Sequence, residues 1–201
     1  IVVKVNKGLN FTKYVLKAVV KKVVDMAKYK FAAELSVNGI RKLRKELQNY
    51  KENILQHKIE MLAKMLSEKG VNIAQIQIAD YNAIFTGELI SSIKSEYGGS
   101  KLGTAIFYVV ADSEHAAFVE FGTGQLGQEG SYPYPFPEGV NWEYNTGDTI
   151  FQISPGQYGW FYPMPDGTWR FTQGMPSRPF MYETWAELTT IVEQTAKEVF
   201  R

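Results

Sequence analysis

Apolar residues recur at helical spacing in three parts of the chain, and this pattern predicts three amphipathic helices. In the first part, from Phe11 to Ala33, lysines lie between the apolar residues. The second stripe is formed by Ile40, Leu43, Leu47, Tyr50, Ile54, Leu62 and Met65. The third lies within residues 181–201 and contains Met181, Trp185, Leu188, Ile191, Val192 and Val199.

Turn and cap residues set the expected ends of these helices. Asn38-Gly39 interrupts the pattern and predicts a turn between the first two helices. Gly70 predicts the end of the second helix, which would then run for about seven to eight turns. In "FTGELISSI", Thr86 would cap a short helix that presents Leu89, Ile90 and Ile93.

The remaining patterns indicate strands and one long loop. "GTAIFYVVADS" (103–113) is the clearest strand, and "GWFYPMPDGTWRF" (159–171) predicts a hairpin with Asp166-Gly167 at its turn. "HAAFVEF" (115–121) fits a helix or a strand equally well. Residues 125–157 predict an ordered loop, because four of its aromatic residues would need burial or a partner: Tyr132, Tyr134, Phe136 and Trp142.

This order of elements predicts an α+β fold. A mixed or antiparallel sheet would pack against a long N-terminal helix and a C-terminal helix, with a long loop and a β-hairpin. The expected division is a basic helical segment at 1–36 followed by an α+β domain at 37–201.

Charge is unevenly distributed, although the net charge is only +1. Residues 1–50 hold 12 Lys and Arg against 3 Asp and Glu, whereas the rest hold 10 basic and 18 acidic side chains. A basic segment of this kind would contact DNA or an acidic partner, or would be a solvated helix face. The candidate contacts are Lys13, Lys17, Lys21, Lys22, Lys28 and Lys30.

Composition excludes several classes of protein. Cysteine is absent, so there is no disulfide framework, which is compatible with folding in a reducing cytoplasm. No apolar run approaches the ~20 residues of a membrane span, and the lysines near the start exclude the core of a signal peptide.

Candidate chemistry is sparse. His57 fits a structural position in the long helix, and His115 lies in a sequential Ser-Glu-His run, unlike the separated groups of a catalytic triad. No metal-binding pattern is present, and no cofactor or catalytic residue is expected. "GTGQLGQEG" (122–130) lacks the Lys-Ser/Thr pair of a phosphate loop, and a mobile loop is the favoured interpretation. The aromatic residues of the predicted hairpin, among them Trp160, Tyr162 and Trp169, would stack on sugar rings or bases if exposed and would form a core if buried. Their number favours a protein interface over a catalytic pocket.

Four segments together resemble the tail-completion proteins of long-tailed bacteriophages, also called head-tail joining proteins or minor tail components. They are "VNGIRKLRKEL", "FTGELISSI", "HAAFVEFGTG" and "MPSRPFMYETW", in the family's order and approximate spacing over residues 37–201. Phe85 stands where the family has Asp, and His115 where it has Tyr. The matching residues are Gly39, Ile40, Thr86, Gly87, Leu89, Ser92, Ile93, Ala116, Val119, Glu120, Phe121, Gly122, Thr123, Pro176, Arg178, Pro179 and Phe180.

The resemblance implies a structural virion protein rather than an enzyme. Such a connector would form a homo-oligomeric ring, of six subunits by analogy with the tail, at the neck between the portal and the tail. It would contact head-completion or connector proteins on one side and tail-tube or tail-terminator proteins on the other, and would line the DNA passage. The expected location is the virion neck or tail, after assembly in the host cytoplasm, without a membrane partner.

The matching residues also suggest physical roles. Phe118, Val119 and Phe121 would anchor their element in the core, and Gly122 with Gly124 would permit a sharp exit. Glu120 and Arg178 are candidates for a charge-assisted pair between two motifs. Two other functions stay open: a carbohydrate-binding or adhesive module that uses the aromatic hairpin, and a hydrolase that uses Glu120.

Overall fold

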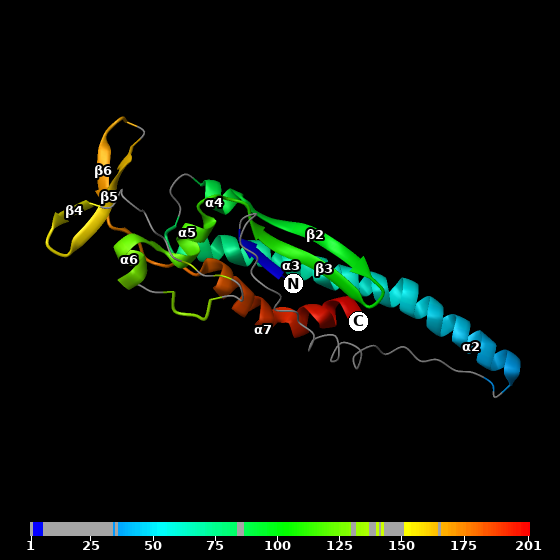
Figure 1. Cartoon of the computed structure of the whole chain (residues 1–201). Coiled ribbons are helices and arrows are strands. Elements are labelled where there is room, and N and C mark those ends of the chain that lie inside the picture. Colours follow the sequence, from blue (N-terminus) through cyan, green and yellow to red (C-terminus); the bar gives the residue numbers. More distant parts are fainter. Residues whose placement is uncertain are drawn as a thin grey trace.

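One continuous helix of three parts forms the long axis of the molecule. The computed structural model describes residues 2–5 (backbone only), 34, 36–83, 87–129 (residue 129 backbone only), 132–136, 140, 142, 151–164 and 166–201. The helix comprises α2 (Val37–Asn49), the π-helical turn η1 (Tyr50–Leu55) and α3 (Gln56–Asp80). Figure 1 shows α2 projecting beyond the sheet at one end of the molecule.

Two sequence-based predictions about this helix were wrong. Asn38-Gly39 is not a turn but lies in the first turn of α2, which is capped by Ser36: the Gly39 N–H donates to the Ser36 hydroxyl at 3.0 Å. Gly70 does not end the helix either. A Cβ atom at Gly70 would lie 2.7 Å from Val109 Cγ2 and 2.9 Å from Leu188 Cδ1, so glycine here permits α3 to approach both β3 and α7 closely.

The main sheet has three strands and is mixed. Its order is β1 (Val2–Val5), β3 (Thr104–Ala111) and β2 (Ile93–Lys101), with β1 parallel and β2 antiparallel to the central strand. Before β2 lies the short helix α4 (Glu88–Ser91). The predicted strand at 103–113 is therefore confirmed, whereas β2 was missed. Ile93, expected on the short helix, begins that strand.

α3 packs against β2 and β3 on one side and against α7 (Phe180–Phe200) on the other. The main core is built by these elements together with α5 (Ala116–Phe121), and its buried members include Ile78, Val109, Phe121, Phe180, Met181 and Leu188. A second cluster fills the far end between α3 and α7, through Leu62, Leu66, Val192, Val199 and Phe200. The α+β class, the long helix and the C-terminal helix are confirmed.

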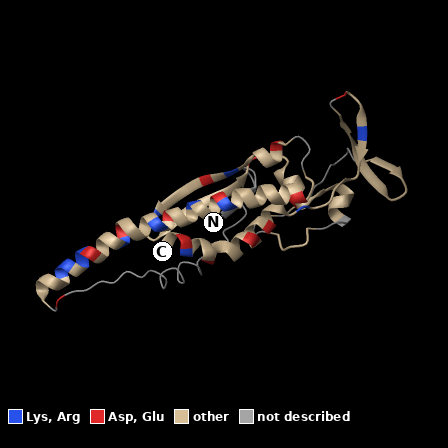
Figure 2. Ribbon diagram, turned by 180° about the vertical axis from the view of Figure 1, so that it is seen from behind, with Lys and Arg blue, Asp and Glu red and all other residues tan. Residues whose placement is uncertain are grey.

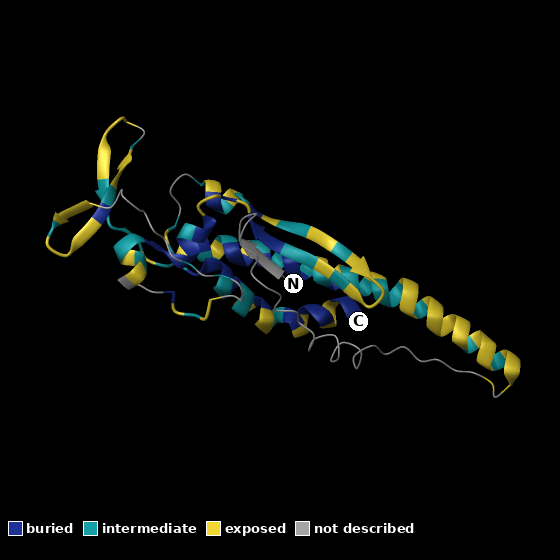
Figure 3. Cartoon of the chain, viewed as in Figure 1, coloured by how far each residue is buried: buried dark blue, intermediate teal, exposed yellow. Residues whose placement is uncertain are grey.

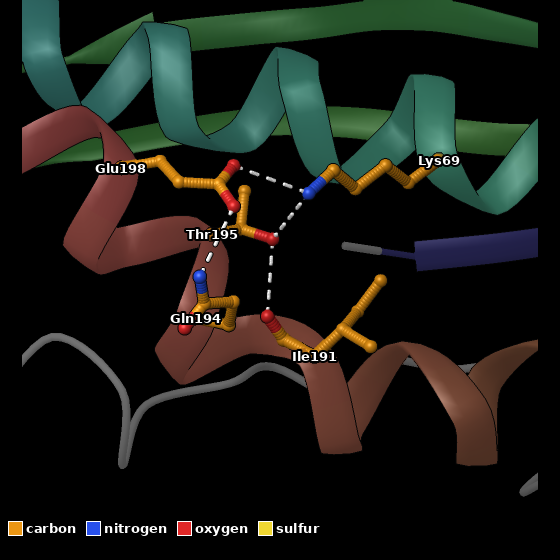
Figure 4. A network of polar contacts seen from close by, with 5 residues as sticks. All are labelled: Lys69, Ile191, Gln194, Thr195 and Glu198. Atoms are coloured by element: carbon orange, nitrogen blue, oxygen red, sulfur yellow. Dashed lines mark hydrogen bonds and ion pairs between the residues drawn. The ribbon is translucent and has the colours of Figure 1, made fainter.

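A polar network also joins α3 to α7, as Figure 4 shows. The ammonium group of Lys69 donates to the hydroxyl of Thr195 at 3.1 Å and pairs with the carboxylate of Glu198 at 3.3 Å. Thr195 is buried and donates to the carbonyl of Ile191 at 3.0 Å, which satisfies its hydroxyl inside the helix. These contacts fix the two helices relative to each other.

A second sheet projects from the end of the molecule opposite to α2 (Figure 1). Its order is β4 (Phe151–Ser154), β5 (Gln157–Pro163) and β6 (Trp169–Thr172), and all neighbours are antiparallel. The hairpin predicted around Asp166-Gly167 is confirmed: the N–H and the hydroxyl of Thr168 both donate to the Asp166 carboxylate, at 2.9 and 2.6 Å. Gly167 has a φ of +81°, which favours glycine at the turn.

The segment that joins the two sheets is helical where a mobile loop was expected. α6 (Gly124–Glu129) begins within the Gly-Thr-Gly stretch, and Thr123 and Gly124 bridge to the short strand β7 (Gly174–Met175). The interpretation of 122–130 as a mobile loop was therefore wrong. None of the described helices is both long and apolar enough to span a membrane.

Candidate functional site

The "HAAFVEFGTG" and "MPSRPF" segments meet inside the molecule, although residues 125–174 separate them in the sequence. The N–H of Arg178 donates to the carbonyl of Val119 at 2.8 Å, and the hydroxyl of Ser177 donates to the carbonyl of Glu120 at 2.8 Å. The N–H of Met175 donates to the hydroxyl of Thr123 at 3.2 Å. The two predicted motifs therefore form one structural unit.

Glu120 lies at the centre of this unit. Its side chain is 0% exposed, and α5 presents it to the first turn of α7. The N–H of Met181 donates to Glu120 Oε2 at 2.8 Å, and the N–H of Tyr182 donates to Oε1 at 3.1 Å. The hydroxyl of Tyr132 donates to Oε1 at 3.2 Å. We call Glu120, Tyr132, Met181 and Tyr182 the Glu120 cluster.

The Glu120 carboxyl acts as the N-terminal cap of α7. The first N–H groups of a helix lack partners within the helix, and the residue before it usually supplies a side-chain acceptor. Here that residue is Pro179, whose side chain has no acceptor and makes no cap hydrogen bond. Glu120 supplies the missing acceptor from a distant part of the chain.

Burial raises the pKa of Glu120 to about 8. The hydrogen bonds from Met181, Tyr182 and Tyr132 lower it, and the nearby charge of Glu183 raises it further. Burial therefore outweighs the three donors, and the carboxyl exchanges its proton near neutral pH instead of near its ordinary value of 4.5.

A second carboxylate, Glu183, lies in the same turn of α7 and also accepts hydrogen bonds from tyrosines. The hydroxyl of Tyr81 donates to Glu183 Oε1 at 2.6 Å, and that of Tyr134 donates to the same oxygen at 3.3 Å. Burial and the Glu183 carboxylate both raise the pKa of Tyr81 above its ordinary value. Two carboxyl groups and several tyrosines thus connect α3, α7 and the segment 132–136.

The segment 132–136 is held against α5 and α7 by aromatic contacts. Tyr134 stacks on Tyr182 with ring centroids 3.7 Å apart, and Tyr132 packs edge-on against Phe121 at 5.0 Å. The prediction that the four loop aromatics would need burial or a partner is confirmed, since Phe136 stacks on Tyr132 and Trp142 packs against Phe121. The indole N–H of Trp142 donates to the Gly122 carbonyl at 3.0 Å, which ties a further part of the same loop to α5.

The expected charge pair between Glu120 and Arg178 was wrong. Among the described residues, no ion pair joins these two side chains, and the carboxyl of Glu120 accepts hydrogen bonds from the Glu120 cluster instead. The physical reason is that the free N–H groups of α7 already occupy both oxygens. Arg178 contributes its backbone N–H to the junction, through Val119.

The other predicted residues divide into three groups. Leu89, Val119, Phe121, Thr123, Pro179 and Phe180 are buried as anchors, and Phe118 is half-buried against Trp142. Gly87 precedes α4 with a φ of +79°, and Gly122 has a φ of +81°, while Pro176 is exposed. Outside the described residues lie Thr86, Lys13, Lys17, Lys21, Lys22, Lys28 and Lys30.

The Glu120 cluster joins α5, α7 and the segment 132–136 inside the molecule. A hydrolytic role for Glu120 would require the three hydrogen bonds to open, because its carboxyl has no exposed surface. Within the part of the chain that the structure describes, no three His, Cys, Asp or Glu side chains gather as metal ligands. His57 and His115 are both exposed, so His57 is not the packed histidine that the sequence suggested.

Sequence analysis missed Tyr81, Glu183 and the capping role of Glu120. A signal was present in the Pro179 that precedes the last helix, since a proline there leaves the helix without a side-chain cap. Comparison of the chain with protein-family models, curated proteins and solved structures gave no match.

Proposed function

We propose that the protein is a structural component of a phage virion, located at the neck or the tail end, where copies form a closed ring. The ring completes the tail or joins it to the head and surrounds the DNA passage. The motif resemblance over residues 37–201 supports the class of protein. Six subunits match the symmetry expected of a tail, and a closed cyclic ring is a common form of homo-oligomer.

The observation that carries the proposal is the exposed apolar surface at both ends of the molecule, on α2 and on the β4–β5–β6 sheet. The β4–β5–β6 sheet presents large apolar side chains on both of its faces, and Figure 3 shows this sheet and α2 mostly as exposed. The exposed members on the sheet are Phe151, Ile153, Tyr158, Phe161, Tyr162 and Trp169. Soluble monomers rarely expose so much contiguous apolar surface, so neighbouring subunits would cover it.

Positive charge gives the ring its expected contact with DNA. Arg41, Lys42, Arg44 and Lys45 lie on the projecting α2, and Figure 2 shows basic residues along that end. Together with the lysines of residues 13–30, they would contact phosphates in the passage without reading the base sequence. The two faces of the ring would bind connector or head-completion proteins and tail-tube or tail-terminator proteins.

Negative-stain images and light scattering of the purified protein test this proposal. We expect closed rings of uniform size, or a position at the neck when virions are labelled. A protein that stays monomeric at high concentration and is absent from virions would overturn it. Replacing Lys13, Lys17, Lys21 and Lys22 by Gln tests the DNA contact separately, because assembled particles should then retain less DNA.

An adhesive or carbohydrate-binding module is the second candidate, and one observation favours it. Trp169 is 66% exposed, and it lies opposite Pro163 in the β5–β6 register, on the same face of the sheet as Phe161 and Phe171. An exposed aromatic face of this kind can stack on a sugar ring. Binding to a glycan array by a monomer that forms no rings would favour this function.

A further inference from the structure

α2 carries an apolar stripe that the described part of the chain leaves uncovered. None of its residues is buried by the rest of the described chain. Val37 is 68% exposed, Ile40 57% and Leu47 43%. A projecting helix of this length gains little stability from its backbone hydrogen bonds alone, and most helical stability comes from packing of the apolar face. The stripe therefore suits a partner surface.

The spacing of the stripe identifies what kind of partner fits. Ile40, Leu43, Leu47 and Tyr50 are separated by three, four and three residues, which is the a and d pattern of a coiled coil. Helices with this period of 3.5 residues pack against other helices along a narrow seam. The flat surface of a sheet or a nucleic-acid groove imposes no such period.

The charges beside the stripe are complementary to those of the same helix in a second copy of the chain. With Ile40 at position a, Arg44 occupies the e position on one side of α2 and Glu46 the g position on the other. Lys51 follows as the next e residue, at the start of η1. In a parallel pair, a g residue faces the e residue five positions further along the other helix, so Glu46 would face Lys51 of the partner subunit. Within the described part of the chain, no ion pair engages Glu46 or Lys51.

We infer that α2 of one copy packs in parallel against α2 of a second copy, through the seam of Ile40, Leu43 and Leu47. An antiparallel arrangement would instead place e residues opposite e residues, so that Arg44 would meet basic side chains. The seam ends near Tyr50, where η1 widens the helix. Two heptads hold a pair weakly, so the inference rests on the proposed function: the oligomer brings the helices together two by two, each pair related by a local two-fold axis.

Disulfide trapping tests this contact. The chain contains no cysteine, so any disulfide in a single-cysteine variant must join the introduced cysteines of two copies. The variant is Leu43→Cys, at a d position, and the matched control is Lys45→Cys, at the outward f position of the same turn. A disulfide requires Cα atoms within about 7 Å. Under mild oxidation we expect disulfide-linked dimers for Leu43→Cys and no such dimers for Lys45→Cys.

A charge exchange tests orientation and partner. Glu46→Lys should reduce the dimer yield of Leu43→Cys roughly fivefold, and adding Lys51→Glu should restore it. Neither substitution touches the core, so unchanged circular dichroism and Tm verify folding. Equal trapping at positions 43 and 45, or no rescue by the exchange, would overturn the inference.

Electron microscopy of the same samples separates the two proposals. If rings form but no disulfide is trapped at position 43, the α2 contact is contradicted and the proposed function is supported. That outcome is also the one expected if another segment or a different protein covers α2. Trapped dimers without rings would remove the ring and leave the α2 contact.

Discussion

Glu120 Oε2 lies 2.8 Å from the backbone nitrogen of Met181, so a carboxyl group on α5 caps the N-terminus of α7. This contact joins two residues that are 61 positions apart in the sequence, and it caps a helix whose own N-cap residue is proline. This buried carboxyl group therefore stabilises the unit together with the backbone contacts of Ser177 and Arg178.

Glu120→Ala should destabilise the fold by about 3 kcal/mol or more, because it leaves two N–H groups and the Tyr132 hydroxyl without an acceptor in a buried site. Glu120→Gln keeps one acceptor oxygen, so we expect a smaller loss of about 1–2 kcal/mol. Chemical denaturation measures both values. Equal stability of Glu120→Ala and the parent would contradict the capping role.

Stability should fall as the pH rises through neutrality. The carboxyl of Glu120 has an ordinary pKa of 4.5, which we take for the unfolded chain, and a pKa of about 8 in the fold. Between these values the folded protein holds a proton that the unfolded chain has released, so the stabilisation is complete below pH 4.5 and is lost as the pH passes 8.

The measurement is the free energy of unfolding between about pH 5 and pH 9, with Glu120→Gln as the control. The parent should lose a few kcal/mol over this range, whereas Glu120→Gln should lose much less because its side chain does not titrate. Parallel curves for the two proteins would assign the pH dependence to other groups.

Gly122 offers a matched test of close packing at the junction. Gly122 and Gly156 have φ values of +81° and +82°, but only Gly122 is surrounded by backbone: a Cβ would lie 2.7 Å from the Ser177 nitrogen and 2.9 Å from the Met175 oxygen. Nothing lies within 4 Å of a Cβ at Gly156.

Gly156→Ala should therefore cost about 1 kcal/mol, the cost of the left-handed conformation alone. Gly122→Ala should cost about 3 kcal/mol, because its φ of +81° with a ψ of 169° lies in a region that is essentially restricted to glycine and because the neighbouring backbone cannot move aside easily. Thermal unfolding of both variants gives the comparison. If the two losses were equal, neither the ψ of Gly122 nor its close packing would add to the cost of a positive φ.

Structural features that depend on neighbouring residues were predicted from the sequence, and features that depend on contacts between distant elements were not. The hairpin at Asp166-Gly167 was predicted because its turn chemistry is contained in four residues. Gly70 was read as a helix end because its real cause, close contact with Val109 and Leu188, lies in distant elements. A glycine that ends a helix and one that permits packing look the same in a single sequence.

The candidate site divides in the same way. Its motifs were found from the sequence, and the structure brings them together at Glu120. The partner of Glu120 was predicted wrongly, because the opposite charge of Arg178 suggested an ion pair. The backbone N–H groups of Met181 and Tyr182 in the first turn of α7 instead need an acceptor, and Glu120 supplies it. The sequence did not decide between helix and strand for "HAAFVEF" for a related reason. A buried glutamate in this segment is stable only because α7, which is distant in the sequence, donates hydrogen bonds to it.

The exposed aromatic sheet gives the last prediction. Trp169→Ser should leave the free energy of unfolding within about 0.5 kcal/mol of the parent, because the indole is 66% exposed and supports no core. It should nevertheless weaken ring assembly, since exposed aromatic residues at interface centres carry much of the binding energy. Ile76→Ser is the matched control, because Ile76 is 58% exposed on α3, away from the projecting sheet. Light scattering should show smaller assemblies for Trp169→Ser only. If both variants assemble like the parent while Trp169→Ser loses glycan binding, the sheet is an adhesive surface instead.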